Sequence, residues 1–293
     1  MSAFLSEIAA AISRSSGASF VVQNMQAVHG GDISQAFTLS DDARSFFVKI
    51  QPAIHLEWFE TEAAGLTELA HANAVRVPQG VCHGVADGQA YLVLKHLLLK
   101  PHGDAAQLGR LLAQQHRVSA TQFGGPRDNW IGATPQPNPW HESWIDFWRD
   151  QRLGFQLQLA AENGYVGALQ ADGEALLTQL DVLFDGYVPA PSLLHGDLWG
   201  GNHGYLSDGS PVIFDPAVYF GDRECDLAMT ELFGGFAPDF YAAYREAWPL
   251  DAGYAVRKTL YNLYHVLNHA NLFGGSYVAQ ARRMAAQLRA HIR

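Results

Sequence analysis

The sequence predicts an α+β protein of two lobes, with a small N-terminal lobe made of an antiparallel sheet plus a helix and a larger, mostly helical C-terminal lobe. Strand-like runs and tight turns are concentrated in the first third of the chain. Helical spacing of apolar residues dominates the second half, and a chain of 293 residues is long enough for two lobes. We predict lobes 1–97 and 98–293.

The composition excludes several classes of protein. Hydrophobic residues make up 48% of the chain and charged residues 16%, as in ordinary globular proteins. A net charge of −10 argues against nucleic-acid binding, which needs a dense basic face. Cys82 and Cys225 are far apart and match no metal-binding spacing, so we expect a reducing, cytoplasmic location. No window resembles a membrane span, because the apolar N-terminal stretch is short and interrupted by Glu7. The oligomeric state stays open.

The most informative stretch is residues 195–215, which read HGDLWGGNHGYLSDGSPVIFD. Asp197 and Asn202 are separated by four residues, and Asp215 follows an apolar run. A carboxylate that faces an acceptor hydroxyl, followed by an amide and a carboxylate that offer hard oxygens to Mg²⁺, is the layout of a kinase catalytic loop and metal-binding strand. We therefore predict Asp197 as the catalytic residue of an ATP-dependent phosphoryl transfer and Asn202 and Asp215 as the metal ligands. His195 is assigned a structural role, in preference to a catalytic acid or a metal ligand.

Positive charge against the phosphates is predicted from Lys49, inside the apolar strand 46–50. An unpaired ammonium there is expensive to desolvate, so Lys49 should have a partner. Glu62 lies beside the apolar stripe of a predicted helix over residues 55–73 and is our candidate for that partner. The alternatives are a lysine that reaches water from an edge strand and a glutamate that is simply solvated.

Two further segments are predicted to bind the nucleotide. Between predicted strands 19–28 and 36–39, the glycine-rich turn brings backbone N–H groups of Gly30 and Gly31 and the hydroxyl of Ser34 within reach of a phosphate, although such a turn can also be an ordinary hairpin. A second hairpin, 81–85 and 90–94, leads into residues that would cross between the lobes and offer backbone groups to adenine. These are Lys95, His96 and Leu97.

The remaining elements are mostly helices. A Gly- and Pro-rich section, 123–140, is predicted to be an ordered loop or flap, and residues 192–194 a short strand that leads into His195. Asp222 is predicted to cap the helix that it begins. The predicted helices span 1–16, 103–118, 144–161, 172–187, 222–233, 238–247, 252–273 and 277–293.

Several stretches resemble the fructosamine kinase (ketosamine-3-kinase) family, a relative of the aminoglycoside phosphotransferases and, more distantly, of protein kinases. They are LLHGDLWGGN, IFDPAVYFGDRECDLAM and LFGGF. The resemblance extends over nearly the whole chain, through FETEAAGL, DNWIGATPQPNPW, FWRDQRLGFQL and LYHVLNHANLFG. It implies a protein-kinase-like fold and ATP-dependent, Mg²⁺-assisted phosphorylation of O3 of a ketosamine, such as a fructosamine or ribulosamine carried on an amine or a protein lysine. The phosphorylated adduct is unstable, so the reaction would reverse glycation.

The resemblance also carries residue roles. It implies Asp197 as the base, Asn202 and Asp215 as Mg²⁺ ligands and Lys49 with Glu62 as the phosphate-binding pair. The residues that match its glycine-rich loop are Gly30, Gly31, Ile33 and Ser34. Two positions depart from the family pattern: Asp32 stands where many relatives have cysteine, and Asp222 where they often have histidine.

Trp199 and His269 are our candidates for substrate binding. An indole close to the catalytic aspartate offers a flat face to a sugar, and a histidine can bond its hydroxyls. The alternative is that both side chains are core packing.

Two other functions are open. The chain can be a kinase of another small hydroxyl compound, such as an aminoglycoside, a choline-like alcohol or a free sugar. It can also be a catalytically inactive nucleotide-binding module, which is disfavoured because all five expected polar residues are present: Lys49, Glu62, Asp197, Asn202 and Asp215.

Overall fold

The computed structural model of the chain describes residues 3–28 and 34–292. The chain folds into two compact units, a first unit of Met1–Asp104 with Gly204–Pro216 and a second unit of Ala105–His203 with Ala217–Arg293. The roles of a nucleotide-binding lobe 1–97 and a catalytic lobe 98–293 stay a prediction. The predicted division at residue 97 has one boundary, whereas the first unit consists of two separate stretches of the chain because residues 204–216 return to it.

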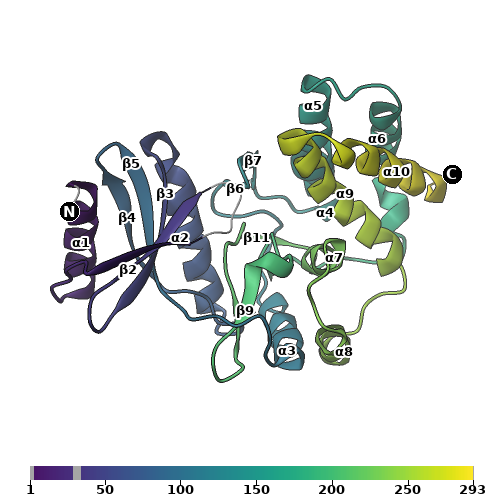
Figure 1. The fold of residues 1–293 in the computed structure, drawn as a ribbon. Coiled ribbons are helices and arrows are strands. Elements are labelled where there is room, and N and C mark those ends of the chain that lie inside the picture. The colour runs from purple at the N-terminus through teal and green to yellow at the C-terminus, as the bar shows by residue number, and fades with distance from the viewer. Residues whose placement is uncertain (1–2, 29–33, 293) are drawn as a thin grey trace. The chain divides into compact units, whose positions relative to one another are not determined.

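A five-stranded antiparallel sheet forms the centre of the first unit (Figure 1). The β4–β5 connection uses Asp87 and Gly88, both with positive φ, which is the geometry of a tight hairpin turn and agrees with the predicted hairpin. Across the sheet the strands are β1 (Asn24–Val28), β2 (Gln35–Ser40), β3 (Ser45–Pro52), β5 (Gln89–Lys95) and β4 (Gly80–Ala86).

Helices cover both faces of this sheet, α1 (Ala3–Ser16) on one and α2 (Leu56–His71), which follows a 3-10 turn at Ala53–His55, on the other. The alternation of side chains along β5 explains the two cores. Tyr91 and Val93 pack with α1, whereas Ala90, Leu92 and Leu94 pack with α2. The strand β5 is therefore buried on both faces of the sheet.

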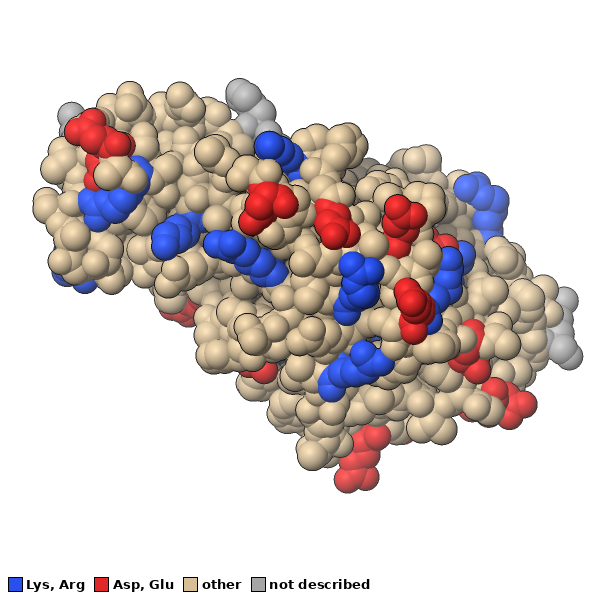
Figure 2. Space-filling view, turned by 90° about the horizontal axis from the view of Figure 1, so that it is seen from below, with Lys and Arg blue, Asp and Glu red and all other residues tan. Residues whose placement is uncertain are grey.

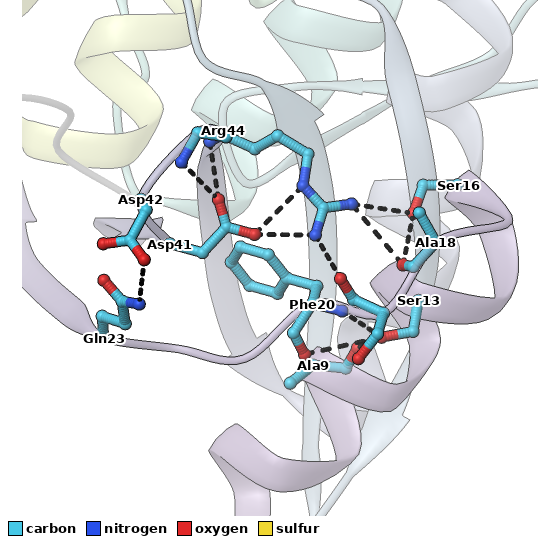
Figure 3. Close-up of polar contacts among 11 residues, drawn as sticks. Ala9, Ser13, Ser16, Ala18, Phe20, Gln23, Asp41, Asp42 and Arg44 are labelled. Atoms are coloured by element: carbon cyan, nitrogen blue, oxygen red, sulfur yellow. Dashed lines mark hydrogen bonds and ion pairs between the residues drawn. The ribbon is translucent and has the colours of Figure 1, made fainter.

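Arg44, in the turn between β2 and β3, ties the end of α1 to the sheet (Figure 3). Its guanidinium donates to Asp41 Oδ2 at 2.7 Å and to the carbonyl oxygen of Ser19, and it lies 5.3 Å from the ring centre of Phe20. The Phe20 backbone N–H in turn donates to Ser13 Oγ on α1 at 2.8 Å. These bonds hold the loop between α1 and β1 in place.

Residues 204–216 return to the first unit through backbone pairing. Tyr205 in β9 (His203–Tyr205) exchanges hydrogen bonds with Lys100 at 2.7 and 2.9 Å. In β10 (Pro211–Ile213), the Ile213 N–H donates to the carbonyl of Arg76 at 3.0 Å. This pairing delivers Asp215 to the first unit.

The second unit is organised around the long helix α9 (Tyr254–Phe273), against which α7 (Glu224–Leu232) and α10 (Ser276–His291) pack (Figure 1). The other helical elements are α3 (Ala105–His116), α4 (Trp144–Trp148), a π turn (Arg149–Leu153), α5 (Gly154–Glu162), α6 (Ala168–Thr178), 3-10 turns at Leu180–Phe184 and Gly200–Asn202, and α8 (Pro238–Ala247). The short strands β6 (Asn129–Ile131) and β7 (Thr134–Gln136) form a hairpin, and β8 (Ser192–Leu194) pairs with β11 (Tyr219–Gly221).

The predicted helix 172–187 is wrong in its extent. The helix begins at Ala168 and ends at Thr178, because Gln179 leaves the helical region with φ −126°. The chain continues as a 3-10 turn, in which the buried side chains of Leu180 and Leu183 lie on the same side, as the three-residue period of that helix requires.

On the face in Figure 2, acidic and basic side chains are interspersed. Within residues 3–28 and 34–292, no helix has both the length and the apolar character that crossing a bilayer requires.

Candidate functional site

Lys49 lies at the centre of a buried ionic group in the first unit. On β3, Phe46 and Val48 face α1, so Lys49 faces α2. Its ammonium donates to both carboxylate oxygens of Glu62 at 2.8 and 2.9 Å and to Asp215 Oδ1 at 2.6 Å. The predicted Lys49–Glu62 contact is present, and the second carboxylate at Lys49 was not predicted.

The Lys49 ammonium is attracted by both carboxylates, whereas the negative charge of Asp215 disfavours the ionised form of Glu62. Burial by itself would lower the pKa of Lys49, but the carboxylates of Asp215 and Glu62 outweigh burial and raise that pKa above its ordinary value. Burial raises the pKa of Glu62, against the opposing effect of Lys49. Lys49 is thus a permanent cation at neutral pH, and 8% of its surface is exposed.

The backbone at Asp215 is strained. Its φ is +56°, a left-handed conformation that non-glycine residues adopt rarely, although aspartate tolerates it better than most. Residues in such conformations cluster at functional sites, where the surrounding structure holds them. Here β10 fixes the chain just before Asp215, and the Lys49 ammonium holds its side chain. The carboxylate stays 41% exposed.

Asp197 and Asn202 are brought together in the second unit. The Asn202 amide nitrogen donates to the Asp197 backbone carbonyl at 2.9 Å and to Asp197 Oδ2 at 3.3 Å. The loop is closed by further backbone bonds from Trp199 N to the Asp197 carbonyl and from Asn202 N to the Trp199 carbonyl, at 3.1 and 3.0 Å. Since the nitrogen side of the Asn202 amide faces Asp197, its oxygen is directed away from that carboxylate.

A buried carboxylate, Asp226 on α7, holds the start of this loop. Its two oxygens accept the backbone N–H groups of His195 at 2.7 Å and Gly196 at 2.9 Å, and His116 Nε2 lies 3.1 Å away. Burial would raise the pKa of Asp226, but the hydrogen bond and charge of His116 and the bond from Gly196 outweigh burial and lower it. His195 is fully buried, and its Nδ1 accepts the backbone N–H of Asp197 at 3.3 Å, which agrees with the structural role predicted for it.

Section 123–140 is anchored at many points in the second unit. Phe123 and His141 exchange backbone bonds at 2.8 Å, and Gly124 does so with Phe220 at 2.7 and 2.9 Å. Arg152, fully buried in the π turn, donates to the Pro137 carbonyl at 2.7 Å and to Asn138 Oδ1 at 2.6 Å. The section is therefore an ordered loop, which is one of the two possibilities, loop or flap, that the sequence predicts.

Gln136 connects this loop to the segment after Asp215. Its amide nitrogen donates to Asn129 Oδ1 at 2.7 Å and to the Ala217 carbonyl at 3.2 Å, and its oxygen accepts the Tyr264 hydroxyl at 2.7 Å. Burial raises the pKa of Tyr264 to about 12, and the negative charge of Asp197 contributes to that rise. Gln136 thus joins β6, α9 and the segment that follows Asp215 within the second unit.

The residues predicted to bind the nucleotide have mixed outcomes. Ser34 Oγ accepts the Gln51 amide at 3.1 Å. The backbone N–H groups of Lys95 and His96 donate to the carbonyls of Gln79 and Ser45, so Leu97 is left as the best backbone candidate for adenine. Gly30, Gly31, Asp32 and Ile33 lie outside the described residues.

Trp199 and His269 lie in one aromatic cluster of the second unit. Both contact Phe233, with ring centres 6.4 Å apart for Trp199 and 5.2 Å apart for His269. Trp199 is 40% exposed, so the alternative that it is core packing is wrong for this residue. The imidazole of His269 is half-buried, and its Nδ1 bonds the backbone carbonyl of His265 at 2.8 Å.

Comparison with known proteins agrees with this arrangement. The model of the fructosamine kinase family matches residues 4–291. The chain belongs to the fructosamine kinase family. It is 46% identical over 283 residues to a protein of Synechocystis named a probable ketoamine kinase, covering 96% of this chain and 95% of that protein. It is 41% identical to the chloroplastic protein-ribulosamine 3-kinase of Arabidopsis thaliana, covering 89% and 81% of the two chains.

Solved structures place the chain in the same family. A crystal structure named as a fructosamine-3-kinase, from Haemophilus somnus, superposes with a TM-score of 0.90 at 30% identity and covers 98% of each chain. The aminoglycoside phosphotransferase APH(4)-Ia superposes with a TM-score of 0.59 at 14% identity, over 97% of this chain and 98% of that one. The second likeness supports the fold alone, which is the predicted protein-kinase-like fold.

Asp222, one of the two departures from the family pattern, has a clear structural role in this member. One oxygen accepts the Tyr187 hydroxyl at 2.9 Å and the backbone N–H of Glu224, the first residue of α7, at 3.0 Å. The other oxygen accepts the Tyr261 hydroxyl at 2.5 Å. These donors require an acceptor at this position, and a carboxylate supplies several lone pairs. The N-cap position of this helix is Arg223, so the prediction that Asp222 is the cap is wrong by one residue.

Two elements of this site were not predicted from the sequence. Asp226 is a carboxylate inside the apolar run Cys225–Met229, and that placement is a signal that it needs buried donors. Glu224 is likewise buried and is held by Arg257 through bonds of 2.8 and 3.1 Å. Neither residue belongs to a motif with a recognisable spacing. The cost of burying an unpaired carboxylate in an apolar helix is the signal that could have identified them.

We predict that Asp226→Asn destabilises the fold. The amide keeps one acceptor but turns an N–H₂ group toward a backbone N–H, which leaves buried donors unpaired and lowers the free energy of unfolding by about 3 kcal/mol. Urea unfolding measures the change, with Asp239→Asn, an exposed carboxylate on α8, as the matched control. Equal stability of the two variants would contradict the anchoring role of Asp226.

A second prediction concerns pH. Burial raises the pKa of Glu224 from its ordinary 4.5 to about 7; the Arg257 hydrogen bond opposes this rise, and the negative charge of Asp222 adds to it. The folded state therefore holds this proton more tightly than the unfolded state, so the contribution is fully present below about pH 4.5 and is lost as pH rises through about 7. Glu224→Gln should flatten the fall in unfolding free energy across this window, by up to about 1.4 kcal/mol per pH unit. Urea unfolding at several pH values tests this prediction, with exposed Glu174→Gln as the control. If Glu224→Gln leaves the dependence of the unfolding free energy on pH unchanged, the prediction is refuted.

Proposed function

We propose that this chain is an ATP-dependent kinase that phosphorylates O3 of ketosamines, such as fructosamine or ribulosamine adducts on amines or protein lysines, and so leads to deglycation. The observation that carries the proposal is the Lys49 group, in which one ammonium is held by Glu62 and Asp215. A catalytically inactive member of the family would have no reason to retain both carboxylates at this cost in desolvation. The names of the ketoamine and ribulosamine kinase relatives supply the substrate class.

In this proposal Asp197 is the base that orients or deprotonates the acceptor hydroxyl. Its carboxylate is positioned by Asn202 and, through the loop backbone, by Asp226. Anchoring of this kind holds a base in the geometry that proton transfer requires. His195 supports the loop and is given no part in the chemistry.

The residues present fit a magnesium ion bound with ATP. Asp215 offers a half-exposed carboxylate and Asn202 an amide oxygen, the hard oxygen donors that Mg²⁺ prefers. Among the described residues there is no group of three or more His, Cys, Asp or Glu side chains that could hold a metal alone, which suits an ion that takes its other ligands from phosphates and water. When bound, the ion neutralises charge on the transferring phosphoryl group.

Lys49 binds the ATP phosphates in this proposal, and Glu62 keeps it in place. The glycine-rich loop, represented by Gly30, Gly31, Ile33 and Ser34, covers the phosphates, and the segment Lys95, His96 and Leu97 meets adenine. The two distant cysteines favour a cytoplasmic location, although the Arabidopsis relative is named as chloroplastic.

A substrate panel tests the function. ATP turnover is measured with fructosyl-lysine, ribulosyl-lysine, choline and an aminoglycoside. We expect turnover with at least one ketosamine and a kcat/KM well above those for choline and the aminoglycoside. Turnover of choline or the aminoglycoside without ketosamine turnover would replace the proposed substrate class, and no turnover at all would favour a nucleotide-binding module.

Asp197→Asn tests the mechanism. Removing a general base lowers turnover by about a hundredfold to ten-thousandfold, whereas ATP binding should stay within about twofold because Lys49 and Glu62 belong to a separate ionic group. Turnover assays and calorimetric titration of ATP measure the two effects, with exposed Asp181→Asn as control. Undiminished turnover in Asp197→Asn would remove this residue from its role.

A further inference from the structure

A set of exposed and half-buried aromatic side chains extends from the Asp197 loop, and we call it the aromatic platform. It consists of Trp199, Phe233, His269, Phe273 and Tyr277. Ring centres are 6.4 Å apart for Trp199 and Phe233 and 5.2 Å apart for Phe233 and His269. His269 lies 5.8 Å from Phe273 and 5.0 Å from Tyr277. The platform thus leads from the catalytic loop to the junction of α9 and α10.

The platform is unusually exposed for such apolar groups. Trp199 is 40% exposed, Phe233 42% and Phe273 53%. Across residues 3–28 and 34–292 the exposed Trp and Phe side chains are these three and Trp140. Three of the four are therefore gathered in one place, and an exposed apolar cluster of this kind marks a binding surface.

The ring faces of the platform are also not covered by the protein's own cations. Within the described part of the chain, no lysine or arginine lies over any of these rings. Elsewhere in the same unit the aromatic faces are occupied: Trp248 carries Arg117 at 5.3 Å and Arg223 at 4.1 Å. The platform therefore offers aromatic faces to a cation from outside.

Glycines fix the platform against the Asp197 loop. A Cβ at Gly201 would lie 2.2 Å from the Trp199 ring, so the indole lies directly on this glycine. A Cβ at Gly235 would lie 2.9 Å from the Gly200 Cα, so the turn after α7 approaches the loop backbone closely. Close packing of these glycines holds Trp199 and Phe233 beside the residue proposed as the base.

We propose that the aromatic platform binds the amine side of the ketosamine, with the protonated secondary amine over Trp199 and Phe233 and the alkyl chain running toward Phe273 and Tyr277. This rests on the proposed function. In a ketosamine only C2 and C1 separate C3, whose hydroxyl faces Asp197, from the nitrogen, so the amine must lie close to the catalytic loop. A cation that carries an alkyl chain is the ligand that uncovered aromatic faces recognise. His269 adds an acceptor: its Nδ1 bonds the His265 carbonyl as a donor, so in the neutral ring Nε2 accepts.

The test compares two substrates that differ only at the nitrogen. One is Nα-acetyl-Nε-fructosyl-lysine, and the other is the same compound with an ether oxygen in place of the amine. We expect the wild-type chain to have a KM for the amine about three- to tenfold below that for the ether. Phe233→Leu keeps an apolar side chain but removes one of the two ring faces, so it should raise the KM for the amine by about two- to threefold, leave kcat within about twofold and reduce the preference by the same factor as the KM change, because the Trp199 face remains.

Two further variants serve as controls. Phe233→Tyr keeps the ring and should restore the preference, and Trp140→Leu removes an exposed aromatic outside the platform and should leave both KM values unchanged. The ratio of the two KM values does not depend on the amount of folded enzyme. If the wild type turns over the amine but Phe233→Leu keeps its preference for it undiminished, the platform does not bind the amine. If the wild type turns over neither compound, the proposed function itself is overturned, and this inference with it.

Discussion

The buried ammonium of Lys49 is the constraint on which the first unit depends. Leaving it unpaired among the apolar residues of β3 and α2 would cost several kcal/mol, so two carboxylates must be brought to it from α2 and from the segment after β10. Once Glu62 and Asp215 are there, their carboxylates raise the pKa of Lys49, and Asp215 contacts the ammonium from a left-handed backbone conformation. The need to pair this ammonium thus links β3, α2 and the returning segment 204–216 within the first unit.

In the second unit, a buried carboxylate that accepts backbone N–H groups holds the Asp197 loop. Here Asp226 accepts two backbone N–H groups at the start of the Asp197 loop, and the Asn202 amide donates to the Asp197 carboxylate, so the residue proposed as the base is positioned through both its main chain and its side chain. The imidazole of His116 lies against the same Asp226 carboxylate at 3.1 Å. The aromatic platform can likewise attract a cation without a carboxylate, because the faces of its aromatic rings carry partial negative charge.

Much of the fold follows from local patterns. The β-prone runs 81–85 and 90–94, the Asp87-Gly88 turn between them and the apolar stripe over residues 55–73 predict a hairpin and a helix of the first unit. The Lys49–Glu62 contact follows from the cost of burying a lysine. The residues that the sequence did not reveal act over long separations: Asp226 bonds a loop 30 residues away, and Lys49 bonds Asp215, 166 residues away. No local period encodes such pairs. The end of α6 at Thr178 was missed because a 3-10 turn continues nearly the same apolar spacing.

The discontinuity of the first unit has a consequence for synthesis on the ribosome. A nascent chain that has reached Asp104 contains α1, α2 and the whole five-stranded sheet, but it lacks β10 and Asp215. Until residues 204–216 emerge, Lys49 has Glu62 as its carboxylate partner and the carbonyl of Arg76 lacks the Ile213 N–H. Chains fold from the N-terminus as they emerge, so the first unit stays incomplete while the segment 105–203 is made. Its completion therefore follows the synthesis of the segment that carries the Asp197 loop.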